Sequence, residues 1–284
     1  MLIRGMRHSA VTVLSLYIML TLCSCSDNDV NASSDSIEQR LALILDGQQR
    51  SAASKARDKY RHPARTLEWF GVKPDMTVVE IFPGGAGWYT EILAPYLMKE
   101  GTFYAAGTNP LSASSSSRNA AKLFKAKMAS NPVYRNVRVT VLEPPDHTEI
   151  APPNSADRVL TFRNVHNWMK AGTAEQIFDA MYRALKPGGI LGLVEHRGDP
   201  GKPQDPKAQS GYVREDFVIK LAEKSGFLYM GSTQINSNAR DTKDYPKGVW
   251  TLPPTLAMKD VDRDKYLAIG ESDRMTLKFM KPVR

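Results

Sequence analysis

The stretch Val78-Val79-Glu80-Ile81-Phe82-Pro83-Gly84-Gly85-Ala86-Gly87-Trp88-Tyr89 decides the fold of this chain. A short apolar, β-prone run ends in an acid, passes through a glycine-rich turn and continues as a helical pattern. A strand that turns through glycines into a helix forms a nucleotide-sized crevice at the strand's carboxyl end. Glycines let the backbone approach a ligand closely because they have no Cβ. The stretch therefore predicts a site for a nucleoside-containing cofactor, or descent from a protein that had one.

The glycine pattern does not match two common phosphate-binding motifs. Its spacing differs from G-x-G-x-x-G, and no G-K-[ST] ending follows. What remains is the looser pattern acid–x–x–x–Gly–Gly–x–Gly, which also occurs as a plain tight connection between a strand and a helix. Features elsewhere in the chain are needed to choose between a cofactor site and a plain connection.

Length and composition indicate an ordinary globular protein. The chain has 284 residues, 42% hydrophobic and 24% charged, enough for one large domain or two small ones. The net charge of +8 favours anionic partners. Because Lys and Arg are spread along the chain rather than clustered, we expect no nucleic-acid partner.

The N-terminus predicts export. Arg4 and Arg7 precede an apolar run over 10–22 that is too short to span a bilayer. The following Leu22-Cys23-Ser24-Cys25 resembles a bacterial lipobox, which predicts a lipoprotein signal peptide over 1–24 and lipidation of Cys25. The alternative is a secreted protein cut after a similar signal, with Cys25 unmodified. In both cases the mature chain has no cysteine pair for an internal disulfide.

A polar segment follows the lipobox. Residues 25–36 are rich in Ser, Asn and Asp and predict a flexible tether. Ser26, rather than Asp, follows Cys25. The resemblance to lipoproteins therefore favours an anchor in the outer membrane, facing the periplasm.

Strand and helix patterns alternate after the tether. A helical extension over 37–74 is expected to contain helices at Ile37–Leu45, Gln48–Tyr60 and Ala64–Phe70. Over 75–284 the patterns predict strands at Thr77–Ile81, Thr102–Ala106, Val137–Leu142, Asp157–Phe162, Ile190–Val194, Phe227–Gln234 and Met275–Met280, with helices at Trp88–Met98, Arg118–Ala129, Ala174–Leu185 and Arg214–Ser225. This alternation indicates a single α/β domain with a mostly parallel sheet.

The order of these parts resembles the class I S-adenosylmethionine-dependent methyltransferases from Thr77 to Pro282. The anchors of the resemblance are Val79-Glu80-Ile81-Phe82-Pro83-Gly84-Gly85, Asp157-Arg158-Val159-Leu160 and Leu185-Lys186-Pro187-Gly188-Gly189-Ile190-Leu191. The segments 56–63 and 271–275 look like a subgroup of exported bacterial methyltransferases. The resemblance implies a Rossmann-like seven-stranded sheet, helices on both faces, an antiparallel last strand and S-adenosyl-L-methionine as cofactor.

The resemblance also assigns cofactor-binding residues. It places the methionine part of the cofactor at Glu80, Gly84, Gly85 and Gly87, although Phe82 replaces the family's first glycine. Asn109 stands where the family usually has an acid for the ribose hydroxyls, and an amide binds them more weakly than a carboxylate.

Two acids follow the third strand, where the family's adenine-contacting acid is expected. Asp146 is preferred over Glu143, because Pro144 and Pro145 set a loop before it. Plain turn chemistry is the alternative for Asn109 and for both acids.

The loop after the fourth strand is expected to lie beside the methyl group. Methyl transfer needs a base only where the nucleophile must lose a proton. Histidine ordinarily changes its charge near neutral pH, so His166 is the candidate base, with His196 as a second candidate at the same rim of the sheet. Asn164 is expected at the cofactor, and with Asn167 it would orient a substrate.

Each histidine has other interpretations. Either one can be a loop hydrogen-bonder. Together with Glu195 or Asp199 they can also ligate a metal, but the spacing is not that of a structural zinc site and no cysteine ligand is present, so we predict none.

Three further segments lie outside the family motifs. Arg57, Arg61 and His62 precede a rigid proline and either cover the pocket and bind an acidic group or form a solvated face. The basic loop 238–243 is a candidate for the substrate side, and 250–254 is expected to be a packed apolar loop.

The sequence leads to two hypotheses of different classes. The first is a lipid-anchored methyltransferase acting on a small molecule or an envelope component. The second is a non-catalytic exported binding protein that kept the fold, because the cofactor is made in the cytosol and the first glycine and the ribose acid are missing. A nucleic-acid methyltransferase is disfavoured by the export signal and by the lack of an Asn-Pro-Pro-aromatic motif.

Overall fold

The computed structural model describes residues 1–2 and 38–283. Residues 3–24 of the predicted signal peptide, the tether and Cys25 lie outside the described residues. Within the described part, no helix is both long and apolar enough to cross a membrane.

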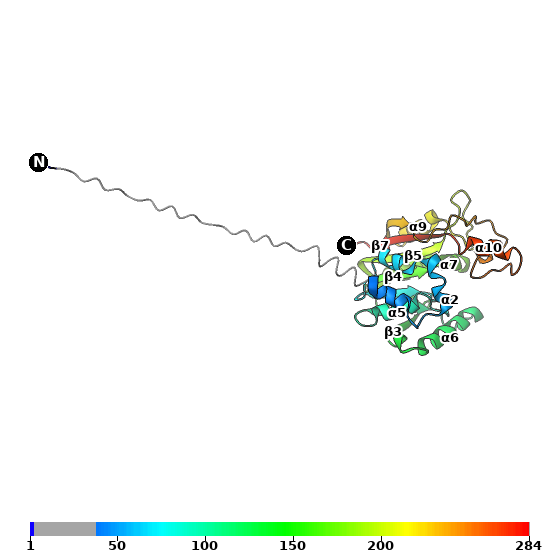
Figure 1. Cartoon of the computed structure of the whole chain (residues 1–284), viewed down its shortest axis with the longest axis horizontal. Helices are drawn as coiled ribbons and strands as arrows, with labels where there is room; N and C mark the ends of the chain where they lie inside the picture. Colours follow the sequence, from blue (N-terminus) through cyan, green and yellow to red (C-terminus); the bar gives the residue numbers. More distant parts are fainter. Residues whose placement is uncertain (3–37, 284) are drawn as a thin grey trace.

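Seven strands form one sheet (Figure 1). They are β1 (Thr77–Ile81), β2 (Thr102–Gly107), β3 (Val137–Val141), β4 (Ala156–Phe162), β5 (Leu185–His196), β6 (Leu228–Thr233) and β7 (Arg274–Met280). Their order across the sheet is β3-β2-β1-β4-β5-β7-β6. The pairs among β1 to β5 are parallel, and β7 runs antiparallel to both of its neighbours. The predicted fold class, a Rossmann-like α/β sheet with an antiparallel last strand, is confirmed.

Helices cover both faces of the sheet, because successive strand residues point to opposite sides. The helices are a segment over 38–45, α2 (Ala52–Lys55), α3 (Asp58–Arg61), α4 (Pro63–Trp69), α5 (Thr90–Leu97), α6 (Ser115–Ala129), α7 (Val165–Ala171), α8 (Ala174–Ala184), α9 (Glu215–Lys224) and α10 (Arg263–Ile269). Val79 of β1 packs in a core with residues of α7, α8 and α9, whereas its neighbour Val78 packs with residues of α4 and α5. The alternation along β1 thus supplies two cores, one on each face.

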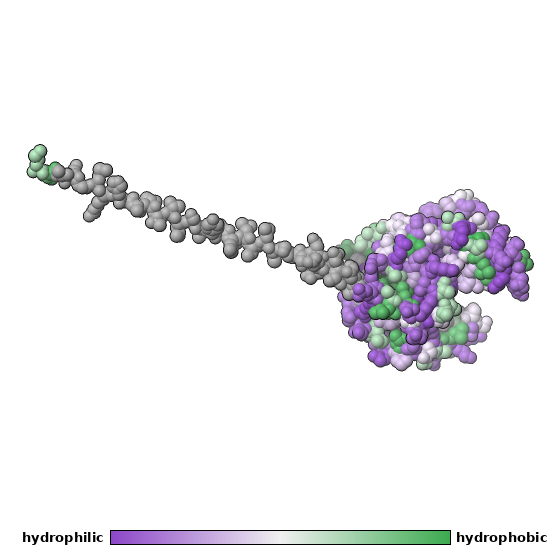
Figure 2. All heavy atoms as spheres, in the orientation of Figure 1, coloured by the Kyte–Doolittle hydropathy of each residue, from purple (hydrophilic) through white to green (hydrophobic). Residues whose placement is uncertain are grey.

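The carboxyl ends of the parallel strands meet at one edge of the sheet. Because β7 is antiparallel, its first residue lies at the same edge, and Arg274 pairs with His196 at the end of β5. Segments that are far apart in the sequence therefore converge there. In the view of Figure 2 the outline of the folded body is notched on the right, between the part that carries α10 and the part that carries α6.

The predicted helix Gln48–Tyr60 is wrong. The first helix ends at residue 45, where the Gln49 amide donates to the Ile44 carbonyl at 2.8 Å. Arg50 donates to the Leu45 carbonyl and pairs with Asp58. These side chains replace the backbone bonds that a continuous helix would make, so the chain continues as two short helices, α2 and α3.

Other boundaries also differ from the prediction: β5, for example, begins at Leu185, five residues before its predicted start at Ile190. The predicted loop after β4 is helical from Val165 onwards. The helix predicted from Arg118 begins at Ser115, because the Ser114 hydroxyl accepts from the Ser117 amide and caps α6. The remaining strands and long helices lie within a few residues of their predicted bounds.

Candidate functional site

The turn after β1 keeps a glycine-like backbone at the position where a glycine was expected. Phe82 has φ 46°, in the left-handed region that favours glycine, and Gly84 has φ 69°. A non-glycine residue in this region costs roughly 1 kcal/mol or more and marks sites where the surrounding structure holds the backbone. Phe82 thus has a left-handed backbone at the position where the resemblance expects a glycine.

Two cavities meet at this turn. The larger has a volume of about 830 Å³ and the smaller one of about 290 Å³. Four residues line both cavities: Phe82, Pro83, Gly84 and Asn164. The shared wall means that groups bound in the two cavities would lie close to each other across Gly84.

The larger cavity lies outside the ends of β1, β2 and β3. Its walls are mainly apolar, with Phe124 and Met128 from α6 and Ile177 from α8. The indole Nε1 of Trp168, another lining residue, is buried and has no partner in the described part of the chain. An apolar slot with a few polar groups suits a flat base joined to a sugar.

Glu143 is the acid among the residues that line the larger cavity. The Asn109 amide donates to its carboxylate at 2.5 Å, while the Asn109 carbonyl accepts from the Leu111 amide at 2.8 Å. Hydrogen bonds from Ser112 and Asn109 lower the pKa of Glu143, so it is a carboxylate at neutral pH. Asp146, the acid preferred from the sequence, is exposed and lines neither cavity.

Glu80 lies at the end of β1 and lines the smaller cavity beside Phe82. Its side chain is almost fully buried and accepts a hydrogen bond from the Thr90 hydroxyl at 2.7 Å. Burial raises the pKa of Glu80 to about 8, although the Thr90 hydroxyl acts in the opposite direction. The carboxyl group is therefore largely protonated at neutral pH until a cation approaches it.

The three predicted glycines have different positions. Gly84 lines both cavities, and an added Cβ there would meet no atom within 4 Å. At Gly85 an added Cβ would lie 2.8 Å from Leu123, and at Gly87 it would lie 3.1 Å from Phe124. Gly85 and Gly87 therefore allow the turn to pack against α6, and among the three only Gly84 faces the cavities.

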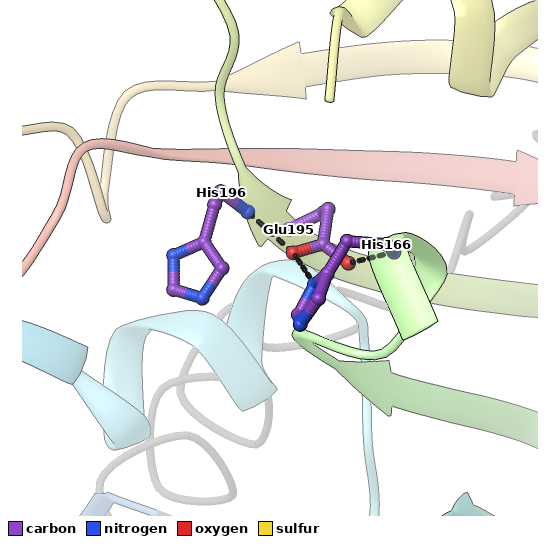
Figure 3. Close-up of side chains that lie close together, drawn as sticks. All are labelled: His166, Glu195 and His196. Atoms are coloured by element: carbon purple, nitrogen blue, oxygen red, sulfur yellow. Dashed lines mark hydrogen bonds and ion pairs between the residues drawn. The ribbon is translucent and has the colours of Figure 1, made fainter. Parts of the chain in front are cut away.

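The smaller cavity contains both candidate histidines (Figure 3). His166 begins α7 and its Nδ1 lies 3.1 Å from the Glu195 carboxylate, which also accepts the His166 backbone amide. Glu195, fully buried at the end of β5, accepts the His196 backbone amide at 2.7 Å as well. A carboxylate at Nδ1 selects the tautomer that protonates this nitrogen and leaves Nε2 free to accept a proton.

His196 is held differently. Its Nδ1 lies 2.6 Å from the Ser272 hydroxyl, and its ring centroid lies 5.4 Å from that of His166. Burial, and then the nearby His166 and Arg163, lower the pKa of His196 well below its ordinary value. His196 is therefore neutral at neutral pH.

His166, Glu195 and His196 are close enough to hold a metal ion. Their ligand atoms lie within 4.8 Å of one another. Both Glu195 oxygens already accept N–H groups, however, and three arginines line the same cavity. The positive surroundings oppose a cation, so the geometry favours a base over a metal ligand set.

The arginines lie on one side of the smaller cavity. Arg61 and Arg274 share the Glu271 carboxylate, and Arg57 binds its other oxygen at 2.5 Å. Burial alone would raise the pKa of Glu271, but these three arginines lower it to about 2. Arg61 is buried and lies over the Trp88 ring at 4.5 Å, so the solvated face considered for it is wrong.

Some site residues gave no local signal in the sequence. Arg163 and Arg274 line the smaller cavity, and Trp250 lies with its ring centroid 6.0 Å from that of His166. The prediction of a purely structural apolar loop at 250–254 therefore needs correction, because Trp250, Pro253 and Pro254 are cavity walls. In the loop 238–243, by contrast, Asp241 is buried against Tyr212 and does not line either cavity.

Comparison with solved structures shows the same architecture. A SAM-dependent methyltransferase from Aquifex aeolicus aligns with a TM-score of 0.53 at 15% identity, covering 86% of this chain and 98% of that one. A geranyl diphosphate methyltransferase in complex with SAM aligns with a TM-score of 0.51 at 12% identity, and the alignment covers 84% of this chain and 94% of that one. The [4+2]-cyclase SpnF aligns with a TM-score of 0.57 at 14% identity, and the alignment covers 90% of this chain and 96% of that one.

These likenesses show that the chain has the class I methyltransferase fold. By sequence, no family model and no curated protein matches it. The neighbours include a cyclase as well as methyltransferases, so the activity must be argued from the site.

Proposed function

We propose that this protein is an S-adenosylmethionine-dependent methyltransferase that acts on a small molecule. The observation that carries the proposal is the junction of the two cavities at Gly84. On one side is a largely apolar slot of nucleoside size, and on the other a smaller chamber that holds His166 on Glu195. A cofactor and an acceptor placed in these cavities would meet at the shared wall.

The residues of the larger cavity fit the cofactor. Its apolar walls suit the adenine ring, and the Glu143 carboxylate can accept hydrogen bonds from the ribose hydroxyls. Asn109 holds that carboxylate in place. Glu143 would thus supply, from the end of β3, the acid that is absent from the end of β2. Glu80 lines the smaller cavity beside the shared wall, where it would face the ammonium group if the methionine part extends past Gly84, because a nearby cation favours its ionised form.

His166 would act as the general base. When bound, S-adenosylmethionine supplies a methyl group on a positively charged sulfur and leaves as the demethylated thioether. His166 Nε2 would take the proton from the attacking hydroxyl, thiol or amine of the acceptor and pass it to solvent. Glu195 fixes the ring through Nδ1 and stabilises the protonated imidazole.

A transfer assay tests this proposal. Purified protein is incubated with S-adenosylmethionine carrying a labelled methyl group and with a small-molecule extract of the source cells. We expect labelled small molecules and an equal amount of demethylated cofactor. Absence of label from every fraction, with a protein that binds the cofactor, would contradict the proposed activity.

A non-catalytic binding protein is the second candidate. It is favoured by Phe82 in place of the glycine and by Asn109 in place of the ribose acid. A protein of this kind would bind a nucleoside ligand in the larger cavity without turnover. Replacing His166 would then leave its affinity for that ligand unchanged.

We further propose that Cys25 carries a lipid anchor that holds the protein at the periplasmic side of the outer membrane. The lipobox-like Leu22-Cys23-Ser24-Cys25 and the preceding apolar run support this location. Membrane fractionation of bacteria that express the protein tests it. Supply of the cofactor outside the cytosol is then a requirement of the proposed activity.

A further inference from the structure

Three arginine side chains line the smaller cavity and are not used by the proposed proton transfer. Arg61 comes from α3, Arg163 follows β4, and Arg274 begins β7. The antiparallel direction of β7 and the N-terminal helices bring them to one place from distant parts of the sequence.

The guanidinium groups of these arginines have hydrogen-bonding capacity that the protein does not use. Arg61 Nη2 and Arg274 Nε are shielded from solvent and have no partner in the described part of the chain. Both residues are nearly fully buried, with 3% and 2% of their surface exposed. A buried donor on a charged group is costly to leave unpaired, so its presence beside a cavity indicates an absent acceptor.

Arg163 adds a third, partly buried guanidinium to the cavity wall. Among the described residues its guanidinium makes no hydrogen bond, and its backbone is held at φ 62° in the left-handed region. Burial and the neighbouring Arg274 lower the pKa of Arg163 to about 10, so it still carries its charge at neutral pH. A strained backbone that holds a charged group at a cavity is typical of a functional residue.

The charge balance around the cavity is positive. Arg57, Arg61, Arg163 and Arg274 contribute four positive charges, whereas Glu271 and Glu195 contribute two negative ones, which leaves a balance of +2. Glu80 adds little negative charge, because most of it is protonated at neutral pH. A bound anion would neutralise the excess and accept the unpaired N–H groups.

We infer that the molecule bound in the smaller cavity carries an anionic oxygen group, a carboxylate or a phosphate, which Arg61, Arg163 and Arg274 bind. This inference rests on the proposed function, in which that molecule is the methyl acceptor. The remaining walls, from Trp88, Phe162 and Trp250, suit an apolar or aromatic body. A volume of about 290 Å³ limits the ligand to a small molecule.

A purely structural role explains only part of the cluster. Glu271 joins Arg57 and Arg61 of the N-terminal extension to Arg274, and this ion-pair network connects the extension to β7. Arg163 has no bond to Glu271 within the described residues, so this role does not require it. Arg163 is therefore the residue that separates the two interpretations.

Calorimetric titration of the purified full chain with three probes tests the inference. Benzoate and phenyl phosphate present the two anionic groups on an aromatic ring, and benzamide is a neutral isostere of benzoate. We expect saturable binding of at least one anion and none of benzamide. Arg163→Gln should weaken anion binding at least about tenfold, the effect of losing one charge-assisted hydrogen bond. Arg214→Gln, which removes an equally half-buried arginine outside both cavities, should not.

The inference is overturned if neither anion binds, if benzamide binds as tightly as benzoate, or if Arg163→Gln leaves anion affinity unchanged. Titration of the same preparations with S-adenosylmethionine separates this from the proposed function. Cofactor binding without anion binding would leave the methyltransferase proposal standing and reject the anionic acceptor. Anion binding without cofactor binding would support the arginine site and reject the methyltransferase.

Discussion

Replacing Glu80 by Gln should make the protein more stable, and the gain should grow with pH. The amide resembles the protonated carboxyl in size and can still accept from the Thr90 hydroxyl. It does not ionise, so it avoids the cost of a buried charge. The pKa of the Glu80 carboxyl is about 8 in the folded protein, against 4.5 for an ordinary glutamate.

The size of the effect follows from this pKa difference. Between these two values the folded state holds a proton that the unfolded state has lost, so the stability of the wild type falls by about 1.36 kcal/mol for each pH unit as pH rises. The Glu80 carboxyl therefore costs nothing well below its unfolded pKa and about 5 kcal/mol above pH 8. Between about pH 5 and about pH 8.5 the advantage of Glu80→Gln should grow by about 4 kcal/mol.

Urea unfolding of both proteins at several pH values measures this advantage directly, because other titrating groups cancel in the difference. Glu68→Gln removes a charge from an exposed glutamate and serves as the control. An advantage of Glu80→Gln that stays constant from acid to alkaline pH would refute the reasoning, since it would mean that Glu80 ionises normally in the folded protein.

Four further predictions concern the site and the N-terminus. Affinity for S-adenosylmethionine should rise as pH rises towards 8, with proton release visible as a buffer-dependent heat, because its ammonium group favours ionised Glu80; in Glu80→Gln this dependence should disappear. Gly84→Val should lower cofactor affinity at least about tenfold, whereas Gly231→Val, at an equally open glycine of positive φ in β6, should not, as calorimetry of both variants would show. His166→Ala should reduce methyl transfer by about 10²- to 10⁴-fold while cofactor affinity stays unchanged. Equal turnover by the variant and the wild type on an identified acceptor would exclude His166 as the general base. Cys25→Ser should release the protein from the membrane fraction, and continued attachment with normal cleavage would contradict the anchor.

Local patterns in the sequence were sufficient for the sheet and for the turn after β1. The apolar run that forms β1 and the glycines after it are contiguous, so their periodicity and turn chemistry are visible in a short window. Helix boundaries were harder to predict where side chains make the decisive bonds. Ser114 caps α6 within a run of serines, and the Gln49 side chain bonds to the Ile44 carbonyl at the end of the first helix.

The chemistry of the site was only partly predictable because it depends on contacts between distant segments. His166 and His196 could be placed at one rim from their positions after β4 and β5. The convergence of Arg61, Arg163 and Arg274 depends on the direction of β7 and on the packing of the N-terminal helices, and no local pattern encodes it. The path of the loop after β3 was also not predictable from local patterns. It places Glu143 at the larger cavity and leaves Asp146 exposed.

The central claim is that the two cavities form a cofactor site and an acceptor site, and calorimetric titration with S-adenosylmethionine and its demethylated product tests it most directly. We predict saturable binding of both compounds with a micromolar dissociation constant, about −8 kcal/mol. Absence of binding by a protein shown to be folded would contradict the claim and would assign the larger cavity to a different ligand.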